Sequence, residues 1–225
     1  ICVMKEIIMV QLCCLFRATI AFFAVFILAA TITVNPAQAR ADSRVLKADA
    51  FILSLINDIR ITVEAATETN DERKAAINAV VDNYFDVDGI TRFSAGRYWR
   101  AASDEQRVHY AKQFRSVLVN TASRQFDQIK GLTFIPTMSK VRGDKLILVG
   151  GIIQDGNGAL PDVEIFWRVS AIAGQPMRVI DVQIENISML KTQRDENEAI
   201  IRRSGGSFDA LLQSLDERLA AMATQ

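Results

Sequence analysis

The spacing of apolar residues changes twice along this chain of 225 residues. Between Asp42 and Gly131, apolar residues recur every three or four positions, which is the spacing of one helix face. From Leu132 to Ile184 they mostly alternate with polar residues, which is the spacing of one strand face. Helical spacing returns after Ser188. The pattern predicts helices, then a block of strands, then helices again.

The part before the strands is expected to form four helices. Their predicted ranges are residues 42–66, 70–84, 88–99 and 103–130. Asp88 is expected to cap the third helix, because an aspartate side chain accepts hydrogen bonds from the free N–H groups of a first turn. Ser103 and Gln106 have the spacing of a capping box, in which each side chain binds the other residue's backbone N–H. These caps predict where the helices begin.

Four strands are expected to follow, joined by short turns. Their ranges are residues 132–139, 146–153, 163–170 and 180–184, the last with Ile180, Val182 and Ile184 on one face. Asp155-Gly156-Asn157-Gly158 is a strong hairpin signal, and hairpins join antiparallel neighbours. Ser188 and Ser207 are expected to cap two closing helices. The sequence predicts an α+β domain whose four-stranded antiparallel sheet packs against helices that precede and follow it.

The first 39 residues have the parts of a secretory signal peptide. Arg17 supplies a positive charge, a mainly apolar run extends from Ala18 to Ala30, and Ala37-Gln38-Ala39 resembles a cleavage site. The run is shorter than the roughly 20 apolar residues that cross a bilayer. Residues 1–39 are therefore predicted to be removed after export, which leaves residues 40–225 as a single domain; an uncleaved anchor is the less favoured alternative.

The predicted mature part has no strong chemical bias. The three cysteines, Cys2, Cys13 and Cys14, lie before the expected cut, so the domain should lack disulfides and thiolate metal sites. After loss of one acidic and two basic residues, 24 basic and 25 acidic residues remain. This balance does not favour nucleic acid or an anionic membrane as the main partner.

The sequence also lacks the motifs of common catalytic and metal sites. His109 is the only histidine and is expected at the surface. The Asp155 turn lacks the glycine at the sixth position and the acidic ligand at the twelfth position of a calcium loop. We therefore predict no catalytic residue and no metal ligand.

Two separated strings resemble the signatures of one known family. The first is Phe85-Asp86, followed by Gly96-Arg97-Tyr98-Trp99-Arg100-Ala101-Ala102-Ser103 and Gln106-Arg107. The second is RVIDVQIENISML at residues 178–190, followed by Gln193-Arg194-Asp195-Glu196. With both strings in order behind a predicted signal peptide, the chain resembles the MlaC periplasmic lipid carriers, or toluene-tolerance auxiliary family, over about residues 45–220.

The chain departs from the family pattern at three positions. The family usually has tryptophan where Met177 stands, glycine at Asn186 and an aromatic residue near Ala122. The last departure concerns the expected lipid pocket, so the preferred cargo can differ.

The resemblance implies a periplasmic carrier that shuttles glycerophospholipid between the outer membrane and an inner-membrane ABC transporter complex, and so maintains outer-membrane lipid asymmetry. It implies no enzymatic activity and no cofactor, with a bound diacyl phospholipid as cargo. The implied partners are the inner-membrane ABC transporter complex and an outer-membrane lipoprotein and porin complex, with no role for nucleic acid.

Such a carrier needs an apolar pocket, and the expected pocket wall combines helix and strand residues. The helix candidates Phe93, Phe114, Val117, Leu118 and Thr121 are expected to face Ile147, Val149, Ile165, Trp167 and Val169 on the sheet. The same residues are also what an ordinary core would contain. Arg92, Arg97 and Arg100 are candidates to contact a headgroup or a partner's carboxylates, or else are solvated helix residues.

Three other functions stay open at this point. The cargo can be a hopanoid or another terpenoid lipid. The domain can be a cofactor-free enzyme for a hydrophobic substrate, with Asp181 or His109 as general base, although alternation places Asp181 on the polar side of its strand. It can also be an adaptor whose apolar interior is only core.

Overall fold

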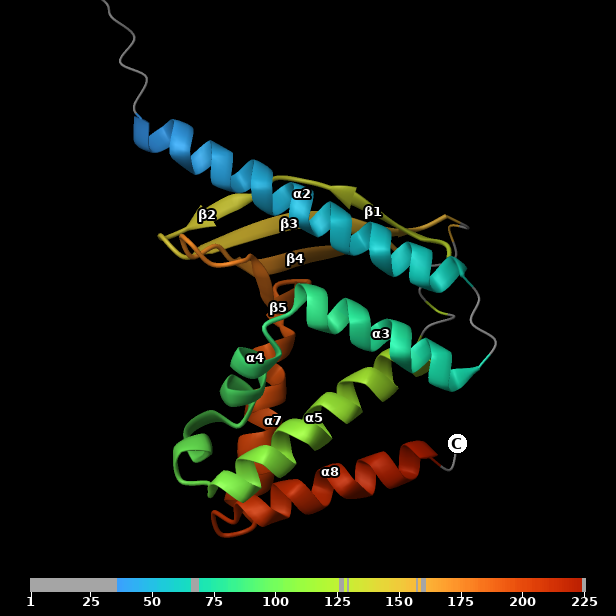
Figure 1. The fold of residues 1–225 in the computed structure, drawn as a ribbon, viewed down its shortest axis with the longest axis vertical. Helices are drawn as coiled ribbons and strands as arrows, with labels where there is room; N and C mark the ends of the chain where they lie inside the picture. The colour runs from blue at the N-terminus through green and yellow to red at the C-terminus, as the bar shows by residue number, and fades with distance from the viewer. Residues whose placement is uncertain are drawn as a thin grey trace, which may run out of the picture. The chain divides into compact units, whose positions relative to one another are not determined.

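Helices precede and follow one antiparallel sheet in the computed structural model of the chain (Figure 1). The structure describes residues 36–65, 69–125, 128, 130–156, 158 and 161–223, with the backbone alone described for residues 36–42 and 70. In chain order the elements are α2 (Pro36–Glu64), α3 (Asn70–Tyr84), α4 (Val87–Ser94), the 3-10 helix η2 (Gly96–Arg100), α5 (Asp104–Arg124), β1 (Leu132–Pro136), β2 (Lys140–Arg142), β3 (Leu146–Asp155), β4 (Val163–Ser170), β5 (Arg178–Ile184), β6 (Ile187–Ser188), α7 (Met189–Arg203) and α8 (Phe208–Ala223).

The chain divides into two units, Ile1–Arg40 and Ala41–Gln225. The predicted signal peptide, residues 1–39, lies outside the described residues except for the backbone of the first turn of α2. Its removal therefore stays a prediction, as does the single domain over residues 40–225. The second unit contains the sheet and the helices that pack on it.

The sheet confirms the predicted α+β class and antiparallel pairing. Its strand order is β1-β3-β4-β5-β6, with β2 also paired to β3, so the described strands form a six-stranded sheet. Four strands were expected, one of them over residues 132–139. In the structure this run forms only β1, and a separate short strand, β2, follows it at Lys140–Arg142; the two pair with different parts of β3. The two-residue strand β6 is too short for alternation to reveal.

A bulge changes the predicted alternation of β5. Val169 pairs with Val179 and Arg168 pairs with Asp181, which leaves Ile180 as an extra residue between them. Because a bulge moves one residue out of register, Val179 rather than Ile180 packs into the core beside Val169. The predicted face of Ile180, Val182 and Ile184 was therefore wrong at Ile180.

The helix caps agree with the sequence at two places and differ at one. The Ser103 capping box is present, and Ser188 accepts a hydrogen bond from the Lys191 backbone N–H. The third predicted helix, however, is capped by Asp86, whose side chain accepts from the Gly89 N–H at 2.9 Å. Asp88 lies in the first turn instead. The prediction of Asp88 as the cap was wrong by two residues.

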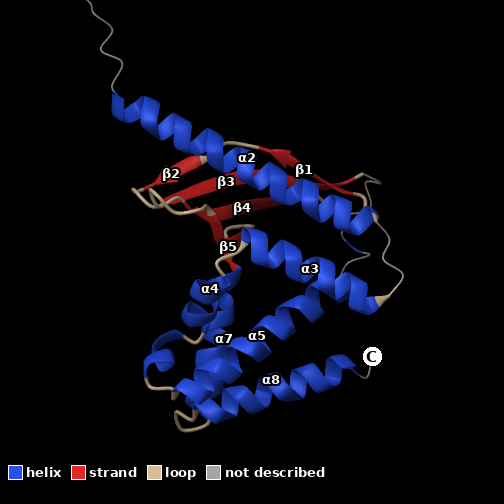
Figure 2. Cartoon of the chain, in the orientation of Figure 1, coloured by secondary structure: helices blue, strands red, loops and turns tan. Residues whose placement is uncertain are grey.

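The buried side chains gather in two main clusters. In the first, Ala48, Ile52 and Leu55 of α2 pack against the sheet. Figure 1 shows α2 running across one face of the strands. The second cluster is made by helices, with Tyr110 of α5 and Leu211 of α8 among its fully buried members. Figure 2 shows the strands grouped together and α4, α5, α7 and α8 gathered beside them.

Candidate functional site

One face of the sheet is lined by apolar side chains and covered by α2. The five strand residues predicted for the pocket lie together on it: Ile147, Val149, Ile165, Trp167 and Val169, all buried. They share this face because each stands at an alternate position of β3 or β4, and the two strands are paired directly. We call this surface the inner face of the sheet.

The helix residues predicted for the opposite wall are not brought to the inner face. Phe114 and Val117 of α5 are buried in the helical cluster, and Leu118 exposes 37% of its surface. Val80 and Tyr84 of α3 pack against the sheet cluster instead, and α3 also contacts α5. The apolar stripe of α5 is visible in the sequence, whereas the element that it meets is not.

A smaller apolar cluster connects the inner face to α5. It contains Val63 of α2, Ile77 of α3 and Val119 of α5. Ile59 of α2 packs against both this cluster and the sheet cluster. Ala122, where the family resemblance leads us to expect an aromatic residue, packs on it as well. An apolar path therefore runs from the inner face to α5. The sequence did not reveal it because its members lie on three separate helices.

Two of the predicted pocket residues carry a buried polar atom without a partner. Among the described residues, neither Trp167 Nε1 nor Thr121 Oγ1 has a hydrogen-bond partner. A buried polar group left unpaired costs about 1–3 kcal/mol, and an indole N–H can only donate. A ligand that offers an acceptor at Trp167 would remove this cost.

Two tyrosine hydroxyls hold the surrounding helices in place. The Tyr110 hydroxyl lies 2.7 Å from Ser94 Oγ of α4 and accepts from Asn197 Nδ2 of α7 at 2.8 Å. Burial raises the pKa of Tyr110, so the hydroxyl stays neutral. The Tyr84 hydroxyl donates to Asp58 Oδ2 at 2.6 Å, and burial together with this hydrogen bond raises the pKa of Tyr84 to about 12. These bonds join α5 to α4 and α7, and α3 to α2.

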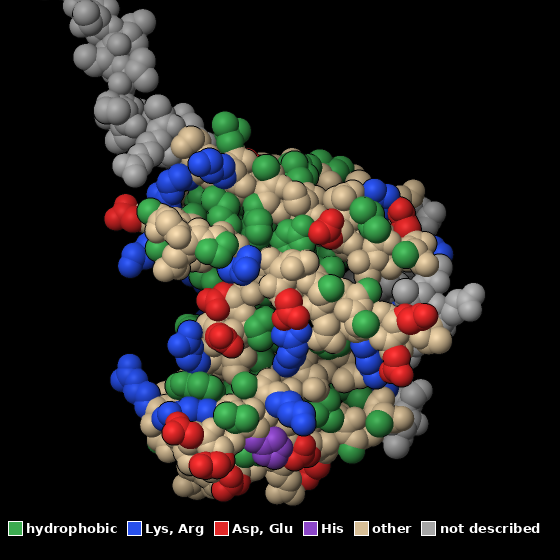
Figure 3. All heavy atoms as spheres, viewed as in Figure 1, with side chains coloured by type: hydrophobic (Ala, Val, Ile, Leu, Met, Phe, Trp, Pro, Cys, Tyr) green, Lys and Arg blue, Asp and Glu red, His purple; other side chains and the backbone are tan. Residues whose placement is uncertain are grey.

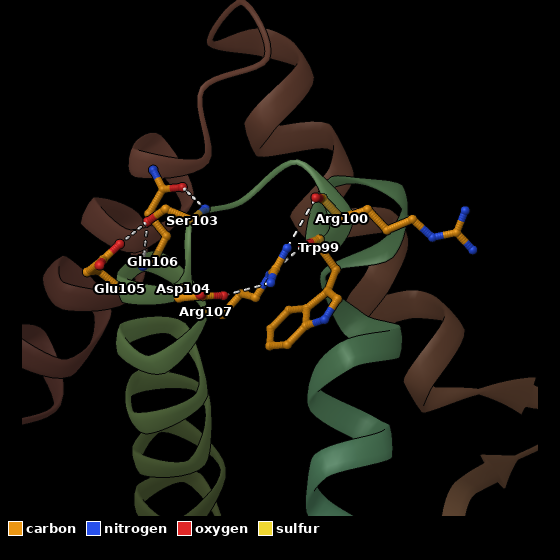
Figure 4. Close-up of polar contacts among 7 residues, drawn as sticks. All are labelled: Trp99, Arg100, Ser103, Asp104, Glu105, Gln106 and Arg107. Atoms are coloured by element: carbon orange, nitrogen blue, oxygen red, sulfur yellow. Dashed lines mark hydrogen bonds and ion pairs between the residues drawn. The ribbon is translucent and has the colours of Figure 1, made fainter.

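The turn between η2 and α5 is fixed by Arg107, as Figure 4 shows. Its guanidinium donates to the backbone oxygens of Trp99 at 3.0 Å and Arg100 at 3.2 Å, and it pairs with Asp104 at 2.9 Å. The Arg100 side chain extends away from this group (Figure 4). Because Arg107 holds the backbone, Arg100 projects from a fixed turn. The signature string thus contains a structural arginine that the sequence reading did not distinguish from its neighbours.

The three arginines predicted to meet a headgroup or a partner are all exposed. Arg92 donates from Nε to its own helix at Asp88 O, 3.2 Å away. Arg97 donates to the Tyr98 hydroxyl at 3.1 Å and lies over that ring. The Arg100 guanidinium forms no hydrogen bond or ion pair with any residue that the structure describes. Arg97 and Arg100 line one hollow, and Arg92 is not part of its wall.

Two adjoining hollows of about 410 Å³ each share Phe93 and Arg194 in their walls. The Arg194 guanidinium lies 4.9 Å from the centre of the Phe93 ring. One hollow extends to Arg97 and Arg100, and the other extends to Arg168 on the sheet. Phe93 was predicted for the pocket wall, but it is 44% exposed and lines these surface hollows instead. We call this region the basic hollows.

Asp181, one of the two residues considered as a general base, is committed to the start of α7. Its carboxylate accepts from Ser188 Oγ at 2.6 Å and from the Leu190 N–H at 3.0 Å, and it pairs with Arg168 at 3.3 Å. It points away from the inner face, as alternation predicts, but it is buried because α7 begins over it. Its hydrogen bonds give it a structural role.

His109, the other residue considered as a general base, lies at the surface. His109 is half exposed, and its Nε2 lies 3.9 Å from Asp216.

Within the described part of the chain, no three His, Cys, Asp or Glu side chains are placed to hold a metal ion. None of the helices in that part is long and apolar enough to span a membrane. The candidate binding features among the described residues are the apolar inner face of the sheet, the smaller apolar cluster beside it and the basic hollows.

Comparison with known proteins matches the chain to a family and to a solved structure of similar fold. The family model described as MlaC protein matches residues 53–217. Among solved structures, the phospholipid-binding protein from Ralstonia solanacearum in complex with a phospholipid is similar, with a TM-score of 0.67 and 22% sequence identity. The match covers 78% of this chain and 98% of that chain, and it shows a shared fold. A search of curated proteins finds no match.

Proposed function

Because this chain belongs to the MlaC family, we propose that it is a periplasmic carrier that shuttles glycerophospholipid between the outer membrane and an inner-membrane ABC transporter complex. The family match over residues 53–217 is the observation that carries the proposal. The bound phospholipid of the similar Ralstonia solanacearum protein supports the same cargo here. The role is binding and transfer without catalysis, in keeping with the structural use of Asp181.

The physical chemistry of the cargo explains why a carrier is needed. Two acyl chains of about 15 methylenes each would cost on the order of 24 kcal/mol to expose to water, at about 0.8 kcal/mol per methylene. That exceeds the practical limit of noncovalent affinity, about 18–21 kcal/mol. The lipid should therefore pass directly from one protein to the next while its chains stay covered.

We place the acyl chains against the inner face and the smaller cluster beside it. Ile147, Val149 and Val169 give that face a fully apolar floor. Trp167 Nε1 lacks an acceptor among the described residues, and the ester carbonyls of a glycerophospholipid are acceptors. Entry of the chains requires α2 and α3 to move away from the sheet, because Ala48, Ile52 and Leu55 of α2 and Val80 and Tyr84 of α3 now pack there.

The two tryptophans of the chain provide a test of this placement. Trp167 lies on the inner face, whereas Trp99 packs against the helical cluster. In the Trp99→Phe variant only Trp167 fluoresces, and in Trp167→Phe only Trp99 does. Mature protein is incubated with vesicles of a phospholipid brominated on its acyl chains, separated from them and measured for quenching.

We expect strong quenching in Trp99→Phe and little in Trp167→Phe, because bromine quenches only on close approach. Equal quenching of the two variants would place the chains elsewhere. No quenching in either, with no lipid carried away from the vesicles, would contradict the carrier function itself.

A further inference from the structure

The basic hollows have more positive charge than their own carboxylates neutralise. Their walls contain five cations and two carboxylates: Arg97, Arg100, Arg168, Lys191, Arg194, Asp181 and Glu198. Asp195 beside them pairs with Lys191 at 2.7 Å and Arg194 at 3.3 Å. Two positive charges remain in excess even when Asp195 is counted. In a concave surface such an excess attracts an acidic ligand.

The cations are spread along the hollows rather than gathered at one point. Arg97 and Arg100 come from η2, Lys191 and Arg194 from α7, and Arg168 from β4. Figure 3 shows Lys and Arg side chains flanking hydrophobic surface on the face where α4 and η2 lie. A single phosphodiester carries one negative charge and would engage one or two of these cations. An extended segment with several carboxylates matches the whole row.

The centre of the row suits a protein partner more than a membrane surface. Phe93 is 44% exposed beneath the Arg194 guanidinium. Aromatic residues, phenylalanine among them, and arginine are enriched at protein interfaces relative to the rest of the surface. A surface that binds a membrane instead combines its basic residues with a broad apolar face that enters the lipid, whereas Phe93 lies in the wall of a hollow.

We propose that the basic hollows around Phe93 and Arg194 are a docking surface for an acidic segment of a partner protein, with an apolar side chain of that segment against Phe93. The inference rests on the proposed carrier function, which requires protein-to-protein transfer and thus a docking partner. We expect the segment to be acidic because the hollows carry excess positive charge. Arg100 is the first candidate to contact it, since the Arg100 guanidinium has no partner among the described residues.

The test compares two variants that make the same change of charge. Arg100→Glu reverses a charge in the hollow, and Lys47→Glu reverses an exposed charge on α2 outside it. Affinity is measured at low and high salt for the purified inner-membrane ABC transporter complex and for the outer-membrane lipoprotein and porin complex. Lipid carried by each variant is measured in parallel by native mass spectrometry.

We expect Arg100→Glu to weaken binding to at least one complex by about tenfold at low salt, mostly through slower association, with a smaller effect at high salt. Lys47→Glu should bind normally, and both variants should carry as much lipid as the unmodified protein.

Unchanged binding of Arg100→Glu to both complexes would overturn the proposal, as would an equal loss in Lys47→Glu. A loss of bound lipid in Arg100→Glu with normal docking would assign the hollows to a headgroup and also overturn it. Absence of lipid from the unmodified protein would instead contradict the carrier function.

Discussion

The fully buried Tyr110 hydroxyl links three helices that support the site. It lies between Ser94 of α4 and Asn197 of α7, and Asn197 Nδ2 also donates to Ser94 O at 2.9 Å. The Tyr110 ring stacks on Phe114 and meets the edge of Phe208. The polar bonds and the ring contacts together fix where α4 and α7 present the basic hollows.

We predict that Tyr110→Phe lowers the free energy of unfolding by about 1–3 kcal/mol, because two buried partners lose a hydrogen bond while the ring stays. Tyr98→Phe is the matched control, since its hydroxyl only accepts from the exposed Arg97 at 3.1 Å and should cost less than about 0.5 kcal/mol. Urea unfolding followed by circular dichroism measures both. An equal loss of unfolding free energy in the two variants would show that the buried Tyr110 hydrogen bonds stabilise the fold no more than the exposed Tyr98 bond does.

Single residues show where sequence reasoning works and where it stops. Alternation placed Ile147, Val149 and Trp167 on one buried face, because a strand's period alone decides which side its residues occupy. It could not place Phe93 with Arg194, since that contact joins residues far apart in the chain. It also could not see that Ile180 is a bulge residue, because the register depends on the neighbouring strand.

The bounds of helices and strands can be predicted from local sequence signals more closely than the contacts between these elements can. The spacing of apolar residues predicted β4 with its observed ends at Val163 and Ser170. The helix predicted from Ser103 to residue 130 ends at Arg124, where the backbone N–H of the C-cap residue Gln125 donates to Ser123 O and Thr121 O. The position of α3 between the sheet and α5 was not predictable, because several arrangements of the same helices would bury the same stripes.

The cap of α4 gives a prediction at this scale. We expect Asp86→Ala to cost about 1 kcal/mol of stability, since its side chain accepts from the Gly89 N–H. Asp88→Ala should cost clearly less, because Asp88 contributes only a favourable charge to the first turn. Thermal unfolding of the two variants under the same conditions compares them. A larger loss in Asp88→Ala would contradict the observed cap.

For the whole molecule, the order of elements and the antiparallel sheet were predictable, whereas the site was predictable only in part. The sequence identified the inner face and the exposed arginines. The separation of Phe114 and Val117 from that face, and the path through Val63 and Val119, depend on how helices pack across the fold. That packing is settled by side-chain fit between distant segments and leaves little trace in local spacing.

The central claim is that this domain carries a phospholipid in its apolar interior. Native mass spectrometry of residues 40–225, purified from a periplasmic fraction without detergent and followed by lipid extraction, tests it most directly. We predict a stoichiometric adduct with the mass of a diacyl glycerophospholipid. A clean apo mass that stays apo after incubation with phospholipid vesicles would contradict the account.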